Sequence, residues 1–335
     1  MRAFVVTGPR QASVADVDPP VAGPGQVVVD VERVGVCGTD VEFFTGEMAY
    51  LHQGHAAYPI RLGHEWCGRV STVGEGVETS WLGRRVTGDT MLGCGRCSRC
   101  RGGRQHLCED RFEIGIRGGW PGALAEQLLV PASALHALPD SVDAVAGAMV
   151  EPGGNALRAV QAAQPVEGTR VLVYGPGTIG LLSVQFALAQ GAEVHVVGHD
   201  AARLVLAAEL GAHGAWTPES LPALAFDAVI DATNSTDVPA LALERVEPGG
   251  RVVYIGLSGR PSLVDTRTMV LKDVTAVGIL SASPGLSGAI DHYARGLVRP
   301  HPLVAATVTL DDAAAVLAGW RPADAGPGPK IHIIP

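Results

Sequence analysis

The chain has 335 residues, of which 47% are hydrophobic and 18% charged, as in an ordinary globular protein of about two domains. A formal net charge of -9 argues against a nucleic-acid partner, because binding to phosphate backbones needs clustered lysine and arginine. The apolar runs are shorter than the roughly 18 residues of a membrane span, and the amino terminus lacks a signal-peptide pattern. We therefore expect a cytoplasmic protein with no membrane partner.

The first third of the chain reads as short strands separated by turns. Valine-rich runs at Gln26–Val36, Gly68–Val73 and Arg85–Thr90 are punctuated by glycine and proline. This pattern predicts a β-rich domain.

From about residue 168 onward, predicted strands alternate with predicted helices, which indicates an α/β fold with a doubly wound parallel sheet. From about residue 284 the alternation loses its regularity, and residues 323–329 are expected to form a loop. The last strand, Lys330–Ile334, is expected to return to the first domain. The strands are predicted at Arg170–Tyr174, Glu193–Val197, Phe226–Asp231 and Arg251–Ile255, and the helices at Ile179–Gln190 and Ala201–Leu210.

Four of the six cysteines, Cys94, Cys97, Cys100 and Cys108, lie in one glycine- and arginine-rich loop. The spacing C-x2-C-x2-C-x7-C is typical of four thiolates that close on one tetrahedral zinc ion and leave no position for a substrate. It predicts a structural zinc site, with an iron–sulfur cluster or disulfides as alternatives. Cys67 has no partner at such a spacing and is interpreted as a small buried hydrophobe. The interleaved arginines are interpreted as a solvated face: Arg96, Arg99, Arg101 and Arg104.

A glycine motif lies between a predicted strand and a predicted helix, which is the context that gives G-x-G-x-x-G its meaning. The glycines allow the backbone to approach a pyrophosphate, and the amino terminus of the helix attracts its charge. The motif predicts a dinucleotide site formed by Gly175, Gly177, Thr178, Ile179 and Gly180.

The second predicted strand of this domain ends at Gly198, where an NAD enzyme usually places an acidic residue for the ribose hydroxyls. Without that carboxylate there is no repulsion against a 2'-phosphate, and His199 and Arg203 offer positive charge. We therefore favour NADP(H). In the alternative interpretation Asp200 binds the ribose and the coenzyme is NAD.

A second group of candidate ligands is weak when each residue is taken singly. Cys37 lies in Gly-Val-Cys-Gly-Thr-Asp, and His64 and Glu65 stand just ahead of a predicted strand. A lone cysteine or histidine is more often a packed or satisfied core residue than a ligand. The glycine motif elsewhere in the chain favours a functional interpretation.

Together these patterns resemble the zinc-containing medium-chain dehydrogenases, the group of alcohol, sorbitol and threonine dehydrogenases. The resemblance implies a GroES-like, β-rich catalytic domain at residues 1–151 and 284–335, with an NAD(P)-binding Rossmann domain at 152–283 inserted between them. It covers nearly the whole chain in the family's order: GHExxGxV at 63–70, a turn at 73–77, the cysteine loop at 94–108, Glu-Pro at 151–152 and the glycine motif at 175–180.

The resemblance further implies a catalytic zinc held by Cys37, His64 and Glu151. The simple-alcohol branch has cysteine at this third position, whereas glutamate resembles the polyol, sugar and threonine branches. Glu65 then approaches the metal transiently or lies behind it. Such a site is open for an alcohol, whose oxygen zinc activates by lowering its pKa.

Two further roles follow from the resemblance. Thr39 occupies the position of a proton relay, and Asp40 that of a carboxylate which orients the ligand histidine. In much of the family the relay ends at a histidine three residues after Thr39. Here that position is glutamate, so the candidates for the proton exit are Glu42, His52, His55 and bulk water.

The expected activity is the reversible oxidation of a secondary alcohol, such as a polyol, cyclitol or sugar-like compound, to its ketone with NAD(P)(H) and two zinc ions. Residues 43–59 are expected at the mouth of the substrate pocket, and Trp66 and Trp120 in the core or pocket wall. A homodimer or homotetramer is expected by resemblance. The alternatives are a quinone-type C=C reductase of the same fold, whose branch normally lacks the zinc ligands, and a non-enzymatic zinc-binding protein.

Overall fold

The computed structural model describes residues 1–335, which divide into two compact units. Unit 1 comprises Met1–Glu151, Val304–Gly326 and Lys330–Pro335, and unit 2 comprises Pro152–Leu303 and Pro327–Pro329. No helix is both long and apolar enough to cross a membrane.

Unit 1 is built on a seven-stranded sheet in the order β16-β17-β3-β4-β5-β9, with β8 also paired to β3. Two separate two-stranded sheets join β1 to β2 and β6 to β7. The predicted valine-rich strands are present with slightly shifted ends. The strands of this unit are β1 (Arg2–Gly8), β2 (Gln11–Asp16), β3 (Gln26–Gly35), β4 (Glu65–Val73), β5 (Arg85–Gly88), β6 (Met91–Leu92), β7 (Phe112–Glu113), β8 (Gln127–Pro131), β9 (Leu135–Ala137), β16 (Val304–Thr309) and β17 (Lys330–Ile334).

The helices of unit 1 are short, and they connect the strands of the sheet. The α-helices are α1 (Gly38–Thr45), α2 (Ala49–His52), α3 (Ser98–Arg101), α4 (Ala144–Ala148) and α11 (Ala313–Leu317). The 3-10 helices are η1 (Thr79–Trp81), η2 (Gln105–Leu107), η3 (Ala132–Ala134) and η6 (Leu310–Asp312).

The last strand, β17, joins the sheet of unit 1 between β16 and β3, so its predicted return to the first domain is confirmed. It pairs in parallel with β16 and antiparallel with β3, where Ile333 is opposite Val34. Ile331 and Ile333 are buried in the core of unit 1. The final residues of the chain therefore pack against strands formed by its first seventy-odd residues.

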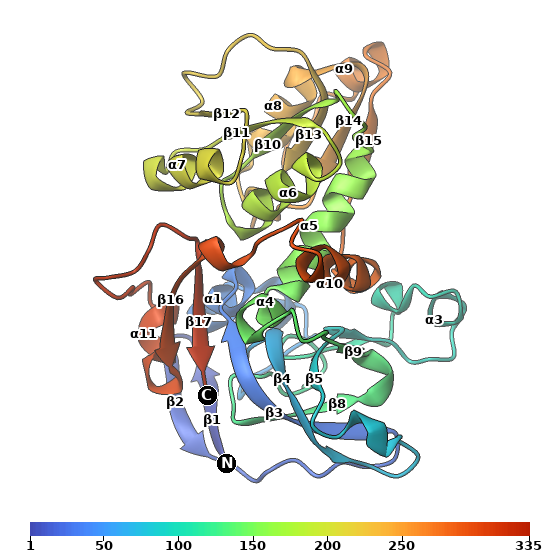
Figure 1. The fold of residues 1–335 in the computed structure, drawn as a ribbon, viewed down its shortest axis with the longest axis vertical. Coiled ribbons are helices and arrows are strands. Elements are labelled where there is room, and N and C mark those ends of the chain that lie inside the picture. The colour runs from blue at the N-terminus through green and yellow to red at the C-terminus, as the bar shows by residue number, and fades with distance from the viewer. The chain divides into compact units, whose positions relative to one another are not determined.

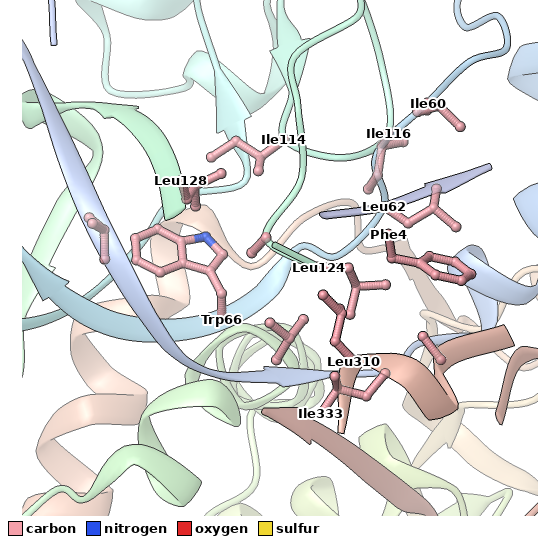
Figure 2. Close-up of a cluster of buried hydrophobic side chains, with 14 of the residues drawn as sticks. Phe4, Ile60, Leu62, Trp66, Ile114, Ile116, Leu124, Leu128, Leu310 and Ile333 are labelled. Atoms are coloured by element: carbon pink, nitrogen blue, oxygen red, sulfur yellow. The ribbon is translucent and has the colours of Figure 1, made fainter. Parts of the chain in front are cut away.

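Trp66 on β4 lies at the centre of the unit 1 core, and its predicted core position is confirmed because the side chain is fully buried. Figure 2 shows its ring beside Leu128 and Ile114. The ring packs so closely on β5 that a Cβ atom on Gly88 would stand 2.7 Å from its Cζ2. Trp120 is half-buried against the same cluster, and its Nε1 donates to the carbonyl oxygen of Leu129 at 3.0 Å.

Unit 2 is a six-stranded, all-parallel sheet in the order β12-β11-β10-β13-β14-β15. Numbered within the unit, this is the order 3-2-1-4-5-6 of a Rossmann fold. Its central strands are continuous apolar runs because helices cover both faces of a parallel sheet. Figure 1 shows α6 and α7 on one face and α8 on the other. The strands are β10 (Arg170–Tyr174), β11 (Glu193–Val197), β12 (Gly214–Trp216), β13 (Phe226–Asp231), β14 (Val246–Tyr254) and β15 (Thr275–Gly278).

Three predicted strands of this unit, β10, β11 and β13, match the structure residue for residue, and the two predicted helices differ only at their ends. The division between the units falls in the first turn of α5 (Val150–Ala163). The other helices of unit 2 are α6 (Thr178–Leu188), α7 (Ala201–Glu209), α8 (Val238–Arg245), α9 (Thr266–Leu271), α10 (Leu286–Ala294), η4 (Ser283–Gly285) and η5 (His301–Leu303).

The return to unit 1 lies at Leu303/Val304 and not at the expected residue 284. Residues 284–303 stay with unit 2 because α10 packs on its helices. The ring of Tyr293 stacks on Phe186 with centroids 6.3 Å apart. Gln185 exchanges two hydrogen bonds with the backbone of Arg299. Periodicity along the sequence does not reveal this packing, because the contacts join segments more than a hundred residues apart.

Replacing Trp66 with alanine should destabilise the protein by about 3–5 kcal/mol, because it empties a fully buried aromatic site. Urea unfolding followed by circular dichroism measures this loss. Trp320→Ala is the matched control, since Trp320 is 45% exposed and its removal should change stability little. Equal effects of the two substitutions would contradict the central place of Trp66 in the core.

Candidate metal and coenzyme sites

The four loop cysteines converge in unit 1, with their sulfur atoms all within 4.8 Å of one another. Sulfur pairs stand 4.0 Å apart for Cys94–Cys100 and 3.9 Å for Cys97–Cys108. Four sulfurs about 2.3 Å from a tetrahedral zinc ion would be about 3.8 Å apart, so the group fits this metal. The distances are almost twice the length of a disulfide bond, and all six cysteines are free thiols, which argues against the disulfide alternative.

The surroundings of these thiols shift their pKa values in opposite directions. Hydrogen bonds from the N–H groups of Arg96 and Cys97 lower the pKa of Cys94 to about 6. The N–H of Cys100 similarly lowers the pKa of Cys97, at the start of α3. Desolvation and the neighbouring Cys97 raise the pKa of Cys100 to about 12. The loop thus stabilises thiolate at two of its four sulfurs, which favours a cation.

The two remaining predictions for this region concern its surface and Cys67, and both are confirmed. Arg96, Arg99, Arg101 and Arg104 are all exposed, and Arg99 pairs with Glu109 at 2.8 Å. Cys67 is fully buried away from the group, and desolvation raises its pKa to about 12.

With the metal removed by a chelator, iodoacetamide at pH 7 should alkylate Cys94 before Cys100, by about tenfold or more in rate, because the thiolate is the nucleophile. The rate at Cys94 should rise with pH and reach half its maximum near its pKa of about 6. Peptide mass spectrometry over time measures both. Cys67 serves as the unreactive internal control, and added zinc should protect all four loop cysteines. Equal rates at Cys94 and Cys100 would contradict the tuning described above.

A second group of donors forms where β3 and β4 pair. Gly35 near the end of β3 is opposite Glu65 at the start of β4. Cys37 therefore lies beside His64, and one donor atom from each of Cys37, His64 and Glu65 lies within 4.8 Å of the others. His64 and Glu65 are buried, whereas Cys37 is partly exposed. The three donors can hold a metal ion, and the site is partly open to solvent on the side of Cys37.

Asp40 lies behind this group and is fully buried. Its carboxylate accepts hydrogen bonds from the N–H groups of Cys37 (2.9 Å) and Gly63 (3.2 Å), and it stands 3.5 Å from Nδ1 of His64. Desolvation acts to raise the pKa of Asp40, but His64 and the two N–H groups outweigh it and hold the pKa below its usual range. Asp40 is thus a buried carboxylate that can fix the ring of His64.

A residue that sequence reasoning missed completes the surroundings of Glu65. The ammonium group of Lys330, on β17, lies 2.8 Å from Oε1 and 2.7 Å from Oε2 of Glu65, and it donates to the carbonyl oxygen of Val36 at 2.9 Å. Both side chains are almost fully buried. Burial lowers the pKa of Lys330, but Glu65 and Cys37 outweigh it and the pKa is raised. The only signal in the sequence was one lysine in an apolar final strand.

Replacing Lys330 with methionine should lower the free energy of unfolding by about 3 kcal/mol, because it leaves the carboxylate of Glu65 buried and unpaired. Urea unfolding in the presence of a chelator excludes any contribution from bound metal. The double variant Glu65→Met/Lys330→Met should recover most of the loss. If the double variant is no more stable than Lys330→Met, the pair does not account for the effect.

The other predicted catalytic residues lie around this group at different depths. Thr39 is half-buried on α1, and Glu42, one turn later, reaches the surface. Partial desolvation and the nearby Glu47 raise the pKa of Glu42. Glu151 is in the first turn of α5. The structure thus brings together Cys37, His64, Glu65 and Asp40.

In unit 2 the glycine motif forms the turn between β10 and α6. Gly175 has a φ of +94°, and a Cβ atom on Gly180 would overlap the carbonyl oxygen of Gly175, so these positions require glycine. Gly177 caps α6, whose helical residues begin at Thr178 and Ile179. The turn stands between β10 and β13, where the strand order reverses, which is where such sheets bind ligands. The free N–H groups at the start of α6 can bind phosphate.

The predicted ribose site follows β11. Gly198 is buried, whereas His199 and Asp200 are exposed. Asp200 caps α7, since its Oδ1 accepts from the N–H of Arg203 at 3.1 Å and its Oδ2 lies 3.2 Å from Nε of the same arginine. Arg203, which was predicted to offer positive charge to a 2'-phosphate, is paired with Asp200.

A Rossmann sheet with a glycine turn and a β-rich unit with two groups of metal donors are the parts of a zinc-binding dehydrogenase. Two family models match this chain, the alcohol dehydrogenase GroES-like domain over residues 23–140 and the zinc-binding dehydrogenase model over residues 178–295. The chain belongs to the zinc-containing medium-chain dehydrogenase family.

Individual relatives agree with this assignment. The chain is 33% identical over 276 residues to an L-threonine 3-dehydrogenase of Anaeromyxobacter sp. (strain K), covering 79% of this chain and 78% of the relative. It is 30% identical over 300 residues to a sorbitol dehydrogenase of Halalkalibacterium halodurans, covering 85% of each.

Two solved structures are similar over almost their whole length. A zinc-binding dehydrogenase of Sinorhizobium meliloti 1021 bound to NADP has a TM-score of 0.90 and 31% identity, with 100% of this chain and 99% of that one covered. The alcohol dehydrogenase RspB of Escherichia coli CFT073, complexed with NADH, has a TM-score of 0.91 and 27% identity with the same coverage.

Proposed function

We propose that this protein interconverts a secondary alcohol and its ketone by hydride transfer with NAD(P)(H), using zinc bound in unit 1. The observation that carries the proposal is the convergence of Cys37, His64 and Glu65 in front of the buried Asp40. The preferred substrates are polyols, cyclitols or sugar-like compounds, in keeping with a sorbitol dehydrogenase and a threonine 3-dehydrogenase among the relatives.

Cys37 and His64 would hold the catalytic zinc, with Glu65 close beside them. Glu151, in the first turn of α5, is proposed as the third ligand, as the family resemblance implies. When bound, zinc acts as a Lewis acid that favours the deprotonated form of a substrate hydroxyl. Asp40 keeps the ring of His64 in place by facing its Nδ1. Lys330 holds Glu65 in place and balances its negative charge.

The proton that leaves the substrate needs a route to water. We assign the proton relay to the hydroxyl group of Thr39 and the exit to Glu42, which lies about one turn later on α1 and is exposed. The raised pKa of Glu42 brings this carboxyl group closer to the range in which a proton is readily taken up and released. His52 is a weaker candidate because its Nε2 is engaged with the carbonyl oxygen of Gly46 at 3.0 Å.

The coenzyme would bind with its pyrophosphate at the turn of Gly175, Gly177 and Gly180 and at the start of α6. NADP(H) is favoured because Gly198 presents no carboxylate against a 2'-phosphate. The NAD alternative depends on Asp200, whose two carboxylate oxygens already face Arg203.

The loop of Cys94, Cys97, Cys100 and Cys108 would hold a second, structural zinc ion with a closed shell. We further assign the catalytic role to unit 1 and coenzyme binding to unit 2. A homodimer or homotetramer is supported by the free edge of β15 and by exposed apolar residues on the preceding α9, Val270 and Leu271. Six unpaired cysteines favour a reducing compartment such as the cytoplasm.

Cys37→Ser should reduce the zinc content from two ions per chain, one for each donor group, to about one, and should abolish alcohol oxidation. Elemental analysis measures the metal, and NAD(P)H absorbance with a panel of polyols and primary alcohols measures turnover. Cys67→Ala is the matched control, because Cys67 is outside both donor groups and should keep both zinc ions and activity.

A wild-type protein with a single zinc ion, or a Cys37→Ser variant that keeps two, would refute the catalytic zinc site. Reduction of quinone C=C bonds by Cys37→Ser at the wild-type rate would favour the alternative reductase activity. Two zinc ions without turnover of any alcohol would favour a non-enzymatic zinc-binding protein.

A further inference from the structure

Gly198 lies directly against Pro176 of the glycine turn, and both residues are buried. A Cβ atom on residue 198 would overlap Cδ of Pro176 and would stand 2.5 Å from its Cγ. Atoms at such distances repel strongly, so one of the two residues would have to move. The proline ring is bonded to its own backbone nitrogen through Cδ and cannot turn away as a flexible side chain does.

The turn that carries Pro176 has little room to retreat. The N–H of Gly175 donates to the carbonyl oxygen of Val197 at 2.9 Å, which ties the turn to the end of β11. On the side of β13, a Cβ atom on Gly175 would stand 2.9 Å from Cγ2 of Thr233. Thr233 is itself fixed by hydrogen bonds from its N–H and hydroxyl to Asp231, at 2.9 and 2.8 Å.

The third side of the turn is closed by α6. A Cβ atom on Gly180 would overlap the carbonyl oxygen of Gly175, so the helix and the turn are already in the closest possible contact. A side chain at residue 198 would therefore push Pro176 into a turn held by β11, by the segment after β13 and by α6. Such a shift distorts the backbone that would receive the pyrophosphate.

We propose that Pro176 is the residue that determines coenzyme specificity, because it excludes every side chain at residue 198. It thereby excludes the carboxylate that would bind the ribose hydroxyls of NAD and repel the 2'-phosphate of NADP. The proposal rests on the coenzyme-binding function proposed above. According to this proposal, glycine is required at residue 198 because Pro176 leaves no room for a side chain. The exposed His199 is then the first residue with a side chain after β11.

The steric part is tested without coenzyme by a double-mutant cycle of thermal unfolding. Gly198→Ala should lower the unfolding temperature in the wild-type background and change it much less in the Pro176→Ala background, because the methyl group then has room. Equal shifts in the two backgrounds would overturn the exclusion of side chains by Pro176.

The specificity part is tested by fluorescence titration with NADH and NADPH. Gly198→Asp alone should weaken binding of both coenzymes by at least about tenfold, because the turn is displaced. Pro176→Ala/Gly198→Asp should recover NADH binding and favour NADH over NADPH by about tenfold more than Pro176→Ala/Gly198→Asn, an uncharged variant of nearly the same size.

The proposal would be overturned if Gly198→Asp bound NADH with wild-type affinity. It would also be overturned if Pro176→Ala/Gly198→Asp bound NADH as weakly as Gly198→Asp does. A wild-type protein that binds neither coenzyme would instead refute the proposed function. In that case the unfolding cycle still tests the contact between Pro176 and Gly198 by itself.

Discussion

The antiparallel pairing of β3 with β4 is the constraint on which the candidate metal site depends. The register that sets Gly35 opposite Glu65 also sets Val34 opposite Trp66, so one ladder of backbone hydrogen bonds aligns both the donors and the core. Cys37 follows the end of β3 and His64 precedes the start of β4. The sheet, and not a free loop, therefore fixes the distance between Cys37 and His64. Its strand β3 is anchored in the core by the buried side chains of Val27, Val28 and Val29.

Buried charge is the second constraint at this site. Asp40, Glu65 and Lys330 are each at most 5% exposed, and removal of such groups from water costs several kcal/mol per ion unless they are paired. Each has partners: Asp40 has two backbone N–H groups and His64, while Glu65 has Lys330. Because Lys330 belongs to the final strand, the surroundings of the candidate ligands are complete only after the carboxyl terminus has joined the sheet of unit 1.

In unit 2 the corresponding constraint is close packing of backbone around the glycine turn. Gly175, Gly180 and Gly198 each stand where a side chain would meet a different neighbour: Thr233, the carbonyl oxygen of Gly175 and Pro176. This close packing allows the backbone to approach a phosphate. It also means that a side chain cannot be added at one of these glycines unless a neighbouring residue changes as well. The choice of residue at the end of β11 is thus linked to a residue more than twenty positions earlier in the chain.

The sequence by itself determined most of the local structure of unit 2 and the grouping of the four loop cysteines, whereas Cys37 and His64 were paired only through the family resemblance. Strands such as β10 and β13 are short apolar runs bounded by turn residues, and the spacing of the four cysteines specifies their convergence within one loop. It did not reveal the partner of Lys330, the contact of Pro176 with Gly198 or the return to unit 1 at Leu303/Val304. Only the tertiary structure decided these, because each depends on contacts between elements distant in the chain, whose geometry local periodicity does not encode.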